Sequence, residues 1–229
     1  MPRWNQFTEQ KLSALSASIK RKRVEFFIRR CSLGPSDTVL DLGSEDGSYL
    51  ASVYPYPHNI VLADVAEAPM RGGVRRYGLK GYQVIPDTGP LPFASASFDA
   101  VWCNSVIEHV TIPRSELGQA SEVDFVRRAE AHQRVFCAEI ARIGKRYCVQ
   151  TPYVHFPIEA HAWLPFIQYL PHPQRFHASS LLKRIWVKQW TADYLLYDLS
   201  RFKAHFPNAT AVLFERVLGL PKALIAIRA

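Results

Sequence analysis

Short apolar runs alternate with longer amphipathic stretches along the first two thirds of the chain. Apolar runs that end at a turn residue or a polar side chain predict five strands, at residues 39–42, 60–63, 82–85, 100–103 and 147–149. Two stretches between them, residues 66–78 and 121–143, have apolar side chains at helical spacing. Strands that alternate with helices are typical of an open α/β sheet with helices on both faces. The pattern therefore predicts a mostly parallel sheet at the centre of the molecule.

The two ends of the chain add helices and a hairpin. Residues 8–30 and 192–206 have the pattern of helices. Residues 210–214 and 223–227 are apolar and flank a turn around Gly219, so they predict two strands that pair with each other. We therefore expect a terminal antiparallel hairpin beside the parallel strands.

Residues 151–190 interrupt this pattern. The segment is rich in aromatic, histidine and proline residues, and its prolines exclude one continuous helix. It follows the fifth predicted strand, so we expect it to lie over the carboxyl end of the sheet as a lid. Its polar side chains include His155, Glu159 and His161, the residue types of a two-histidine, one-carboxylate metal site. Their spacing matches no known ligand motif, and polar residues among aromatic ones commonly hydrogen-bond a loop together, so no metal is predicted.

Carboxylates surround the turn that follows the first predicted strand. Asp41 precedes Gly43, and Glu45 and Asp46 stand between that glycine and Gly47. Glycines let the backbone turn sharply and approach a ligand closely. The acids would repel a pyrophosphate, but they suit a ligand that carries positive charge.

Asp64 closes the second predicted strand, about 20 residues after the turn. An acid at this separation is placed to accept the ribose hydroxyls of a nucleoside. A nucleoside that carries positive charge fits both observations, and S-adenosylmethionine has a sulfonium and an ammonium group. The turn and Asp64 therefore favour S-adenosylmethionine over a dinucleotide.

The same residues resemble the first motif of the class I S-adenosylmethionine-dependent methyltransferases, V-L-D-x-G-x-G-x-G, over residues 39–47. Further along, Asp87, the run Leu91-Pro92-Phe93 and the pair Phe98-Asp99 match signals that the family carries between its third and fourth strands. The resemblance implies a Rossmann-like, seven-stranded, mostly parallel sheet with a C-terminal antiparallel hairpin. It also implies that S-adenosylmethionine is the cofactor, bound by Asp41, Gly43, Ser44, Gly47, Asp64, Val65, Asp87, Thr88 and Asn104.

One residue departs from the family's motif, because Glu45 stands where the middle glycine is usual. We expect this position of the turn not to require a positive φ angle, and the carboxylate to point to solvent or to the ammonium group of the cofactor. The departure also leaves open the alternative of a cofactor-binding relative without activity.

Four side chains are candidates for catalysis by such an enzyme. Glu108 and His109 follow the fourth predicted strand, and His155 and His161 lie in the lid. A base is needed only where the acceptor must lose a proton, as a hydroxyl must. In the similar ubiquinone-type O-methyltransferases an acid–histidine pair at this place has been linked to a metal, but relatives carry the pair without one, and a hydrogen-bonded helix start is the alternative. We expect the lid histidines to act on the acceptor and the Glu108–His109 pair to lie beside the methionine end of the cofactor.

Length and composition fit one domain over residues 1–229. We divide it into an N-terminal helical segment (1–35), a cofactor-binding core (36–150), the lid (151–190), and a C-terminal helix and hairpin (191–229). The chain is 48% hydrophobic, has no run of 18 or more apolar residues, and starts without an apolar signal segment. Unpaired spacing of the cysteines favours buried free thiols and a cytoplasmic protein; they are Cys31, Cys103, Cys137 and Cys148.

The formal net charge is +8, but the basic residues are spread over the chain. We interpret the densest run, residues 20–23, as a solvated helix surface, with contact to a phosphate or an anionic membrane surface as the alternative. Residues 104–107 read N-S-V-I where nucleic-acid amino-methyltransferases carry an N-P-P-Y type motif, so a nucleic-acid acceptor is disfavoured and kept as the alternative. The favoured partner is a small-molecule acceptor, methylated at oxygen or nitrogen. No pattern in the sequence predicts an oligomeric state.

Overall fold

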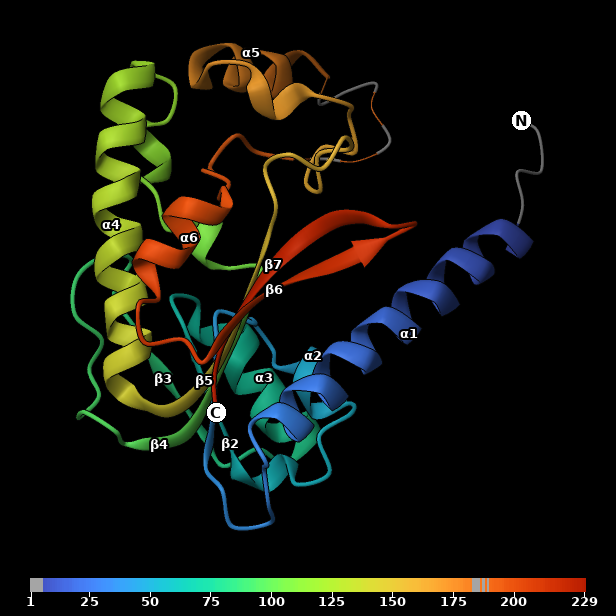
Figure 1. Cartoon of the computed structure of the whole chain (residues 1–229), viewed down its shortest axis with the longest axis vertical. Helices are drawn as coiled ribbons and strands as arrows, with labels where there is room; N and C mark the ends of the chain where they lie inside the picture. The colour runs from blue at the N-terminus through green and yellow to red at the C-terminus, as the bar shows by residue number, and fades with distance from the viewer. Residues whose placement is uncertain (1–5, 183–185, 187, 189) are drawn as a thin grey trace.

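A seven-stranded sheet forms the centre of the protein in the computed structural model, which describes residues 6–182, 186, 188 and 190–229 (Figure 1). The strands are β1 (Val39–Leu42), β2 (Ile60–Asp64), β3 (Gly81–Val84), β4 (Phe98–Asn104), β5 (Gly144–Pro152), β6 (Ala211–Val217) and β7 (Leu220–Arg228). Their order across the sheet is β3-β2-β1-β4-β5-β7-β6.

Strands β1 to β5 run parallel to one another, and β7 pairs antiparallel with both β5 and β6. The predicted fold class is confirmed: a mostly parallel, Rossmann-like sheet that ends in an antiparallel hairpin. The chain proceeds from β1 to β2 on one side and later returns to β4 on the other side of β1, so the strand order reverses between β1 and β4. In open α/β sheets the ligand crevice lies at the carboxyl ends of the strands at such a point.

Helices cover both faces of the sheet, as the pattern predicts. On one face lie α1 (Gln6–Arg30), α2 (Ser48–Ala51) and α3 (Glu67–Tyr77), and on the other lie α4 (Glu122–Ile143) and α6 (Leu199–His205). Phe27 of α1 packs on the first face, where the centroid of its ring is 5.0 Å from that of Trp102 in β4. Phe136 and Ile140 of α4 are buried on the second face. The apolar stripe of α4 therefore belongs to the core, as predicted.

Two further expectations concern the cysteines and the membrane. All four cysteines are buried and free, as the sequence predicts. Within the described ranges, no helix is both long and apolar enough to cross a membrane.

The helix expected over residues 192–206 is shorter than the sequence suggests. α6 begins only at Leu199, where the side chain of Asp198 caps it by accepting a backbone hydrogen bond from its first turn. The preceding stretch is extended because its backbone groups bond to other segments; for example, Leu195 N donates to Glu108 O at 2.8 Å. The prediction is therefore wrong for the first part of the range, and this extended stretch contributes to the site described below.

Between β5 and the extended stretch, the chain forms an irregular segment at one end of the molecule (Figure 1). It contains a short 3-10 turn, η4 (Ile167–Tyr169), and one helix, α5 (His172–Leu182). α5 packs against α4, where the ring of His172 stacks on that of Phe125 with 3.8 Å between their centroids. The segment and the extended stretch share an apolar cluster, made of Ala162, Ile167, Trp190, Ala192, Tyr194 and Leu196.

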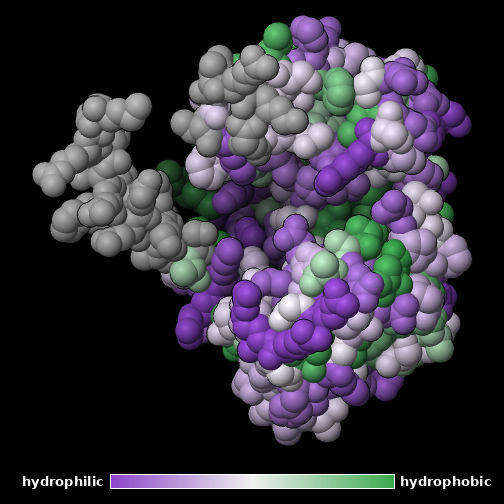
Figure 2. Space-filling model, turned by 180° about the vertical axis from the view of Figure 1, so that it is seen from behind, coloured by the Kyte–Doolittle hydropathy of each residue, from purple (hydrophilic) through white to green (hydrophobic). Residues whose placement is uncertain are grey.

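This segment corresponds to the predicted lid, although residues 183–185, 187 and 189 of that range lie outside the described residues. Figure 2 shows a hollow between this end of the molecule and the part below it. The position of the segment after β5 is consistent with a lid, and its role and the domain boundaries stay predictions.

The basic run at residues 20–23 is only partly the solvated surface that the sequence favours. Its first three residues are exposed, but the side chain of Arg23 is only 15% exposed. Arg23 lies one helical turn before Phe27, so it shares the face of α1 that meets the sheet. Its guanidinium donates to Glu215 in β6 through Nε at 2.8 Å and Nη2 at 2.5 Å. The interpretation as a solvated surface is therefore wrong for Arg23.

Candidate active site

The turn after β1 is closely packed. Gly43 has φ 78°, and a Cβ atom there would lie 2.5 Å from Val106 Cγ1. Gly47 has φ 69°, and a Cβ atom there would lie 2.5 Å from Leu62 Cδ2. An L side chain at either position would have a strained φ angle and would clash with its neighbour. This turn therefore requires glycine at both ends. The turn thereby stays close to the carboxyl ends of β1 and β2.

Asp41 is fully buried in β1, below this turn. The hydroxyl of Ser44 donates a hydrogen bond to Asp41 Oδ1, and Oδ2 has no partner among the described residues. Burial raises the pKa of Asp41 to about 7, with a further contribution from the charge of Asp64. A buried carboxylate oxygen without a donor is costly, and a cationic group would satisfy it.

Asp64 at the end of β2 is 8% exposed and firmly oriented. Its Oδ2 accepts a hydrogen bond from Glu45 N at 3.0 Å, and its Oδ1 accepts one from Ala66 N at 3.1 Å. Each carboxylate oxygen can accept a second hydrogen bond. The orphaned oxygen of Asp41, the glycine turn and this oriented acid together fit a positively charged nucleoside.

The other predicted cofactor residues lie along the same edge of the sheet. Val65 is exposed directly after Asp64, and Asp87 and Thr88 are exposed in the loop after β3, the strand next to β2. Asn104 is half-buried at the end of β4. Their positions are those that a ligand across the carboxyl ends of β1 to β4 would reach, and their contacts with it stay predictions.

Glu45 corrects one expectation. Its φ angle is 53°, which is the left-handed region that favours glycine. This conformation aims the backbone N–H of Glu45 at Asp64 Oδ2, so the turn needs a positive φ here even though the residue is not glycine. The side chain itself is exposed. The expectation that this position tolerates an ordinary φ is therefore wrong.

We expect Glu45→Gly to unfold at a higher temperature than Glu45→Ala. A left-handed conformation costs an L residue about 1–2 kcal/mol, of which the larger entropy of unfolded glycine offsets about 0.5–1 kcal/mol. Both variants remove the carboxylate, so their difference isolates the backbone strain, and thermal denaturation measures it. Equal melting temperatures would show that the turn relaxes around an alanine. Cofactor affinity should change by less than about tenfold, since Asp64 keeps its backbone donor.

A second group of polar side chains lies at the end of β4. Glu108 belongs to the 3-10 turn η2 (Ile107–His109) and is fully buried. The hydroxyl of Thr151, in the neighbouring strand β5, donates to Glu108 Oε2 at 3.0 Å. Glu108 Oε1 has no hydrogen-bond partner among the described residues. The buried carboxylate of Glu108 is therefore held through Oε2, and Oε1 can accept a hydrogen bond from another group.

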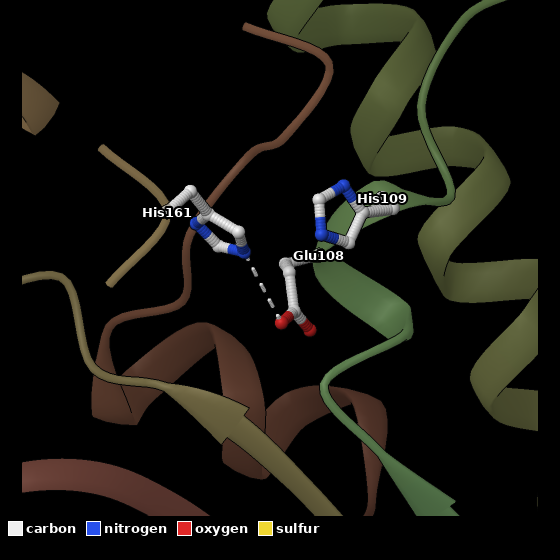
Figure 3. A group of neighbouring side chains, drawn as sticks. All are labelled: Glu108, His109 and His161. Carbon is white, nitrogen blue, oxygen red and sulfur yellow. Dashed lines mark ion pairs between the residues drawn. The ribbon is translucent and has the colours of Figure 1, made fainter. Parts of the chain in front are cut away.

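His161 of the lid points at that available oxygen (Figure 3). Its Nε2 lies 3.8 Å from Glu108 Oε1, and its Nδ1 lies 2.6 Å from Glu159 Oε1. Glu159 is in turn held by the backbone N–H groups of His161 and Ala162, at 2.9 and 2.5 Å. Burial lowers the pKa of His161, but the carboxylates of Glu108 and Glu159 outweigh it and raise the pKa to about 9.

Residues from the extended stretch before α6 complete the group. The ring of Tyr194 stacks on His161 with 4.4 Å between their centroids. Asp193 Oδ1 lies 3.1 Å from His109 Nδ1, and the ring of His109 meets that of His161 edge-on at 4.7 Å. Neither Asp193 nor Tyr194 is among the predicted site residues, because the sequence predicts a helix here and no spacing signal marks these two side chains.

The prediction from the sequence places the lid histidines and the Glu108–His109 pair in two separate groups. The structure brings His161 to that pair, so the separation does not hold for this histidine (Figure 3). His155 is exposed elsewhere in the lid, where its Nδ1 lies 3.0 Å from the hydroxyl of Tyr169. Of the two lid candidates, His161 alone joins the group at the end of β4.

Glu108, His109 and His161 offer ligand atoms that all lie within 4.8 Å of one another, which is close enough for a metal ion. A protonated imidazole has no free lone pair for a metal, and the carboxylates beside His161 raise its pKa to about 9. The positive charge of a protonated His161 balances the carboxylates of Glu108 and Glu159, as a metal ion would. The absence of a resident metal therefore stays our prediction.

Comparison with known families shows where this site belongs. Residues 40–124, which include the glycine turn, Asp64, Asp87 and the Glu108–His109 pair, match the family model described as a methyltransferase domain. The chain carries a class I S-adenosylmethionine-dependent methyltransferase domain. The cofactor of this methyltransferase is S-adenosylmethionine, as the charges around the turn and the place of Asp64 predict.

Solved structures share the fold of this methyltransferase at low sequence identity. The geranyl diphosphate C-methyltransferase from Streptomyces coelicolor has a TM-score of 0.59 at 12% identity, over 99% of this chain and 85% of that one. A geranyl diphosphate methyltransferase in complex with S-adenosylmethionine has a TM-score of 0.56 at 13% identity, over 99% and 91%. The magnesium protoporphyrin IX methyltransferase from Synechocystis has a TM-score of 0.51 at 12% identity, over 100% and 90%. Likeness at these identities shows the fold alone, and no curated protein matches the sequence.

Proposed function

We propose that this methyltransferase methylates a small molecule at oxygen or nitrogen, with His161 as the general base. The single observation that carries the proposal is the pairing of His161 with Glu159 at 2.6 Å, which leaves Nε2 free to face the end of β4. S-adenosylmethionine supplies, when bound, a methyl group activated on a sulfonium. Asp41, Asp64 and the glycine turn would hold it, and the protein's remaining task is to align the acceptor and exclude water, which is worth about 7–11 kcal/mol.

The arrangement around His161 suits proton transfer from an acceptor. Glu159 accepts the hydrogen bond from Nδ1, so in the neutral ring the lone pair that can accept a proton lies on Nε2. The carboxylates raise the pKa of His161 to about 9, so the neutral form, and turnover with it, should increase as the pH rises toward that value. As the acceptor oxygen or nitrogen forms its bond to the methyl group, its proton passes to His161 Nε2. The imidazolium that results is stabilised by Glu159 on one side and by Glu108 on the other. Tyr194 fixes the plane of the ring by stacking on it.

The side chains of the lid suit a flat or partly apolar acceptor. Three of its aromatic side chains, Trp163, Phe166 and Tyr169, are exposed. Aromatic faces bind flat molecules by stacking and apolar ones by burial. Two enzymes that share the fold, the geranyl diphosphate and magnesium protoporphyrin IX methyltransferases, are named for small-molecule acceptors, which also supports the proposal.

The alternatives are a nucleic-acid methyltransferase and a relative without activity. Residues 104–107 read N-S-V-I rather than an N-P-P-Y type motif, which disfavours the first. The buried arrangement of Glu108, His161 and Glu159 disfavours the second, because burying charged groups is costly without a function for them. We also propose a cytoplasmic location, which the four free thiols support.

Transfer of labelled methyl groups from S-adenosylmethionine into a cell extract tests the proposal. We expect label in the fraction that passes a small-molecule filter, insensitive to nuclease and to protease. Label that nuclease releases from a large polymer would favour the nucleic-acid alternative. Bound cofactor without any transfer, over extracts from several growth conditions, would favour the inactive relative. Mass spectrometry of the labelled product then identifies the acceptor atom.

We expect Glu159→Gln to lower the pKa of His161. The neighbouring carboxylates raise this pKa to about 9 against the effect of burial, so the ring holds its proton below that pH and releases it as the pH rises through it. Removing one negative charge should make the ring titrate at a lower pH. NMR of the ring protons over about pH 4–10 measures this without an acceptor. An unchanged titration would contradict the pairing, and His172, whose pKa burial lowers, is the internal control.

A further inference from the structure

The charges of the cofactor pose a question that the glycine turn does not answer. The methionine end of S-adenosylmethionine carries an ammonium and a carboxylate. The turn after β1 offers only acids, at Asp41, Glu45 and Asp46, and these suit the ammonium alone. A carboxylate beside them needs a cation from another part of the chain.

Two arginines reach this edge of the sheet among the described residues. Arg76 lies 3.8 Å from Asp46 in the turn but is 69% exposed, whereas Arg23 is only 15% exposed and contacts the end of β4. Its Nη1 lies 3.5 Å from Asn104 Oδ1, at the carboxyl end of β4 and next to β1. Arg23 also acts on Tyr49 in α2, the helix that follows the glycine turn: burial raises the pKa of Tyr49, and the charge of Arg23 opposes that shift. Arg23 thus lies between the end of β4 and the helix after the turn, where the methionine end is expected.

The guanidinium is held in a fixed orientation, and its hydrogen bonds to described residues use only part of its N–H donors. Glu215 takes the hydrogen bonds of Nε and Nη2 in a two-point contact. The contact from Nη1 to Asn104 is long, at 3.5 Å. A guanidinium has five N–H donors, and a planar fork fixed on one side is well prepared to bind a carboxylate with the other.

We propose that Arg23 binds the carboxylate of the cofactor's methionine end through Nη1, with Glu215 holding its guanidinium in place. Asp41 and Arg23 then divide the two charges of that end between them. The cofactor site on this reading extends beyond the residues of the matched family model, because α1 and the C-terminal hairpin each contribute one member of the Arg23–Glu215 pair. The inference concerns cofactor binding and does not depend on the proposed acceptor chemistry.

Calorimetry with two ligands tests the proposal. S-adenosylhomocysteine carries the carboxylate, and 5′-methylthioadenosine lacks the whole amino-acid end. We expect Arg23→Met to weaken binding of S-adenosylhomocysteine about 10- to 100-fold, as for loss of a charged hydrogen bond, and to leave binding of 5′-methylthioadenosine within about twofold. Lys22→Met, at the exposed neighbouring position, is the matched control and should change neither affinity.

Two results would overturn the proposal. Equal weakening of both ligands by Arg23→Met would mean that Arg23 only maintains the fold, and unchanged binding of S-adenosylhomocysteine would mean that the carboxylate lies elsewhere. If the Arg23→Met variant does not fold, ligand binding to the wild-type protein still tests the proposal. Decarboxylated S-adenosylmethionine should then bind about 10- to 100-fold more weakly than S-adenosylmethionine, and equal affinities would refute a cationic carboxylate site.

Discussion

Replacement of His161 by glutamine is expected to lower turnover by ~10²-fold or more, while the affinity for S-adenosylmethionine stays within a few-fold. Glutamine can still donate a hydrogen bond to Glu159, but it has no nitrogen that takes up a proton, so the base is lost with little change in packing. His161→Ala should lose turnover to the same extent. Turnover is measured on the acceptor found by methyl labelling, and affinity is measured by calorimetry.

His155→Ala is the matched control, because it removes an imidazole from the same segment. His155 is exposed and bonds to Tyr169 rather than to the group at the end of β4, so its loss should change turnover by only a few-fold. Equal losses at both positions would mean that the lid acts through its packing. Breaking a buried ion pair can cost about 3–5 kcal/mol, and His161 lies between two buried carboxylates, so thermal unfolding of each variant must be followed as well.

The second large effect is expected at Asp64. Asp64→Ala should weaken S-adenosylhomocysteine binding roughly 10- to 100-fold, because the ribose hydroxyls lose a charged acceptor worth about 1.5–3 kcal/mol. The substitution also releases the backbone N–H groups of Glu45 and Ala66, which now bond to the carboxylate at 3.0 and 3.1 Å. The turn would lose part of its support, so the loss should fall in the upper part of that range. Calorimetry measures it directly.

Glu67→Ala is the control for charge. Glu67 is an exposed acid in the first turn of α3, where it accepts a hydrogen bond from the hydroxyl of Tyr82 at 2.8 Å. Its removal changes the net charge as much as Asp64→Ala does, but it touches no predicted cofactor residue. Similar weakening by both variants would show a general electrostatic effect, and Asp64 would then not be the ribose acceptor.

Much of the fold follows from local patterns in the sequence. The strands of the parallel core are short apolar runs, and each run expected in the sequence is a strand in the structure. The hairpin is equally local, since Gly219 turns between two apolar strands. The positions of Asp41 and Asp64 near the ends of β1 and β2 also follow from the sequence, because each residue comes at the end of an apolar run that predicts a strand.

The rest of the site depends on contacts between distant segments, which no local pattern encodes. Asp193 and Tyr194 lie in a stretch with helical periodicity, yet its backbone bonds to the turn around Glu108 and makes it extended. Arg23 belongs to a run of basic residues, and its tertiary contacts with Glu215 in β6 and Asn104 in β4 distinguish it from its neighbours. Glu45 is held at a positive φ by the hydrogen bond that it donates to Asp64. In each case a tertiary contact outweighs the residue's own preference.

The antiparallel hairpin has a consequence for the assembly of the chain during synthesis and refolding. β6 and β7 are neighbours in sequence, whereas β7 meets β5 through long-range pairs such as Tyr147 with Arg228. Local hairpins form within microseconds and long-range pairings more slowly, so the parallel strands can assemble while one edge of β5 is still open. An apolar strand with an open edge is a template for pairing between molecules. Substitutions that weaken the docking of β7 should therefore deplete the enzyme by aggregation, while the molecules that finish folding keep their full specific activity.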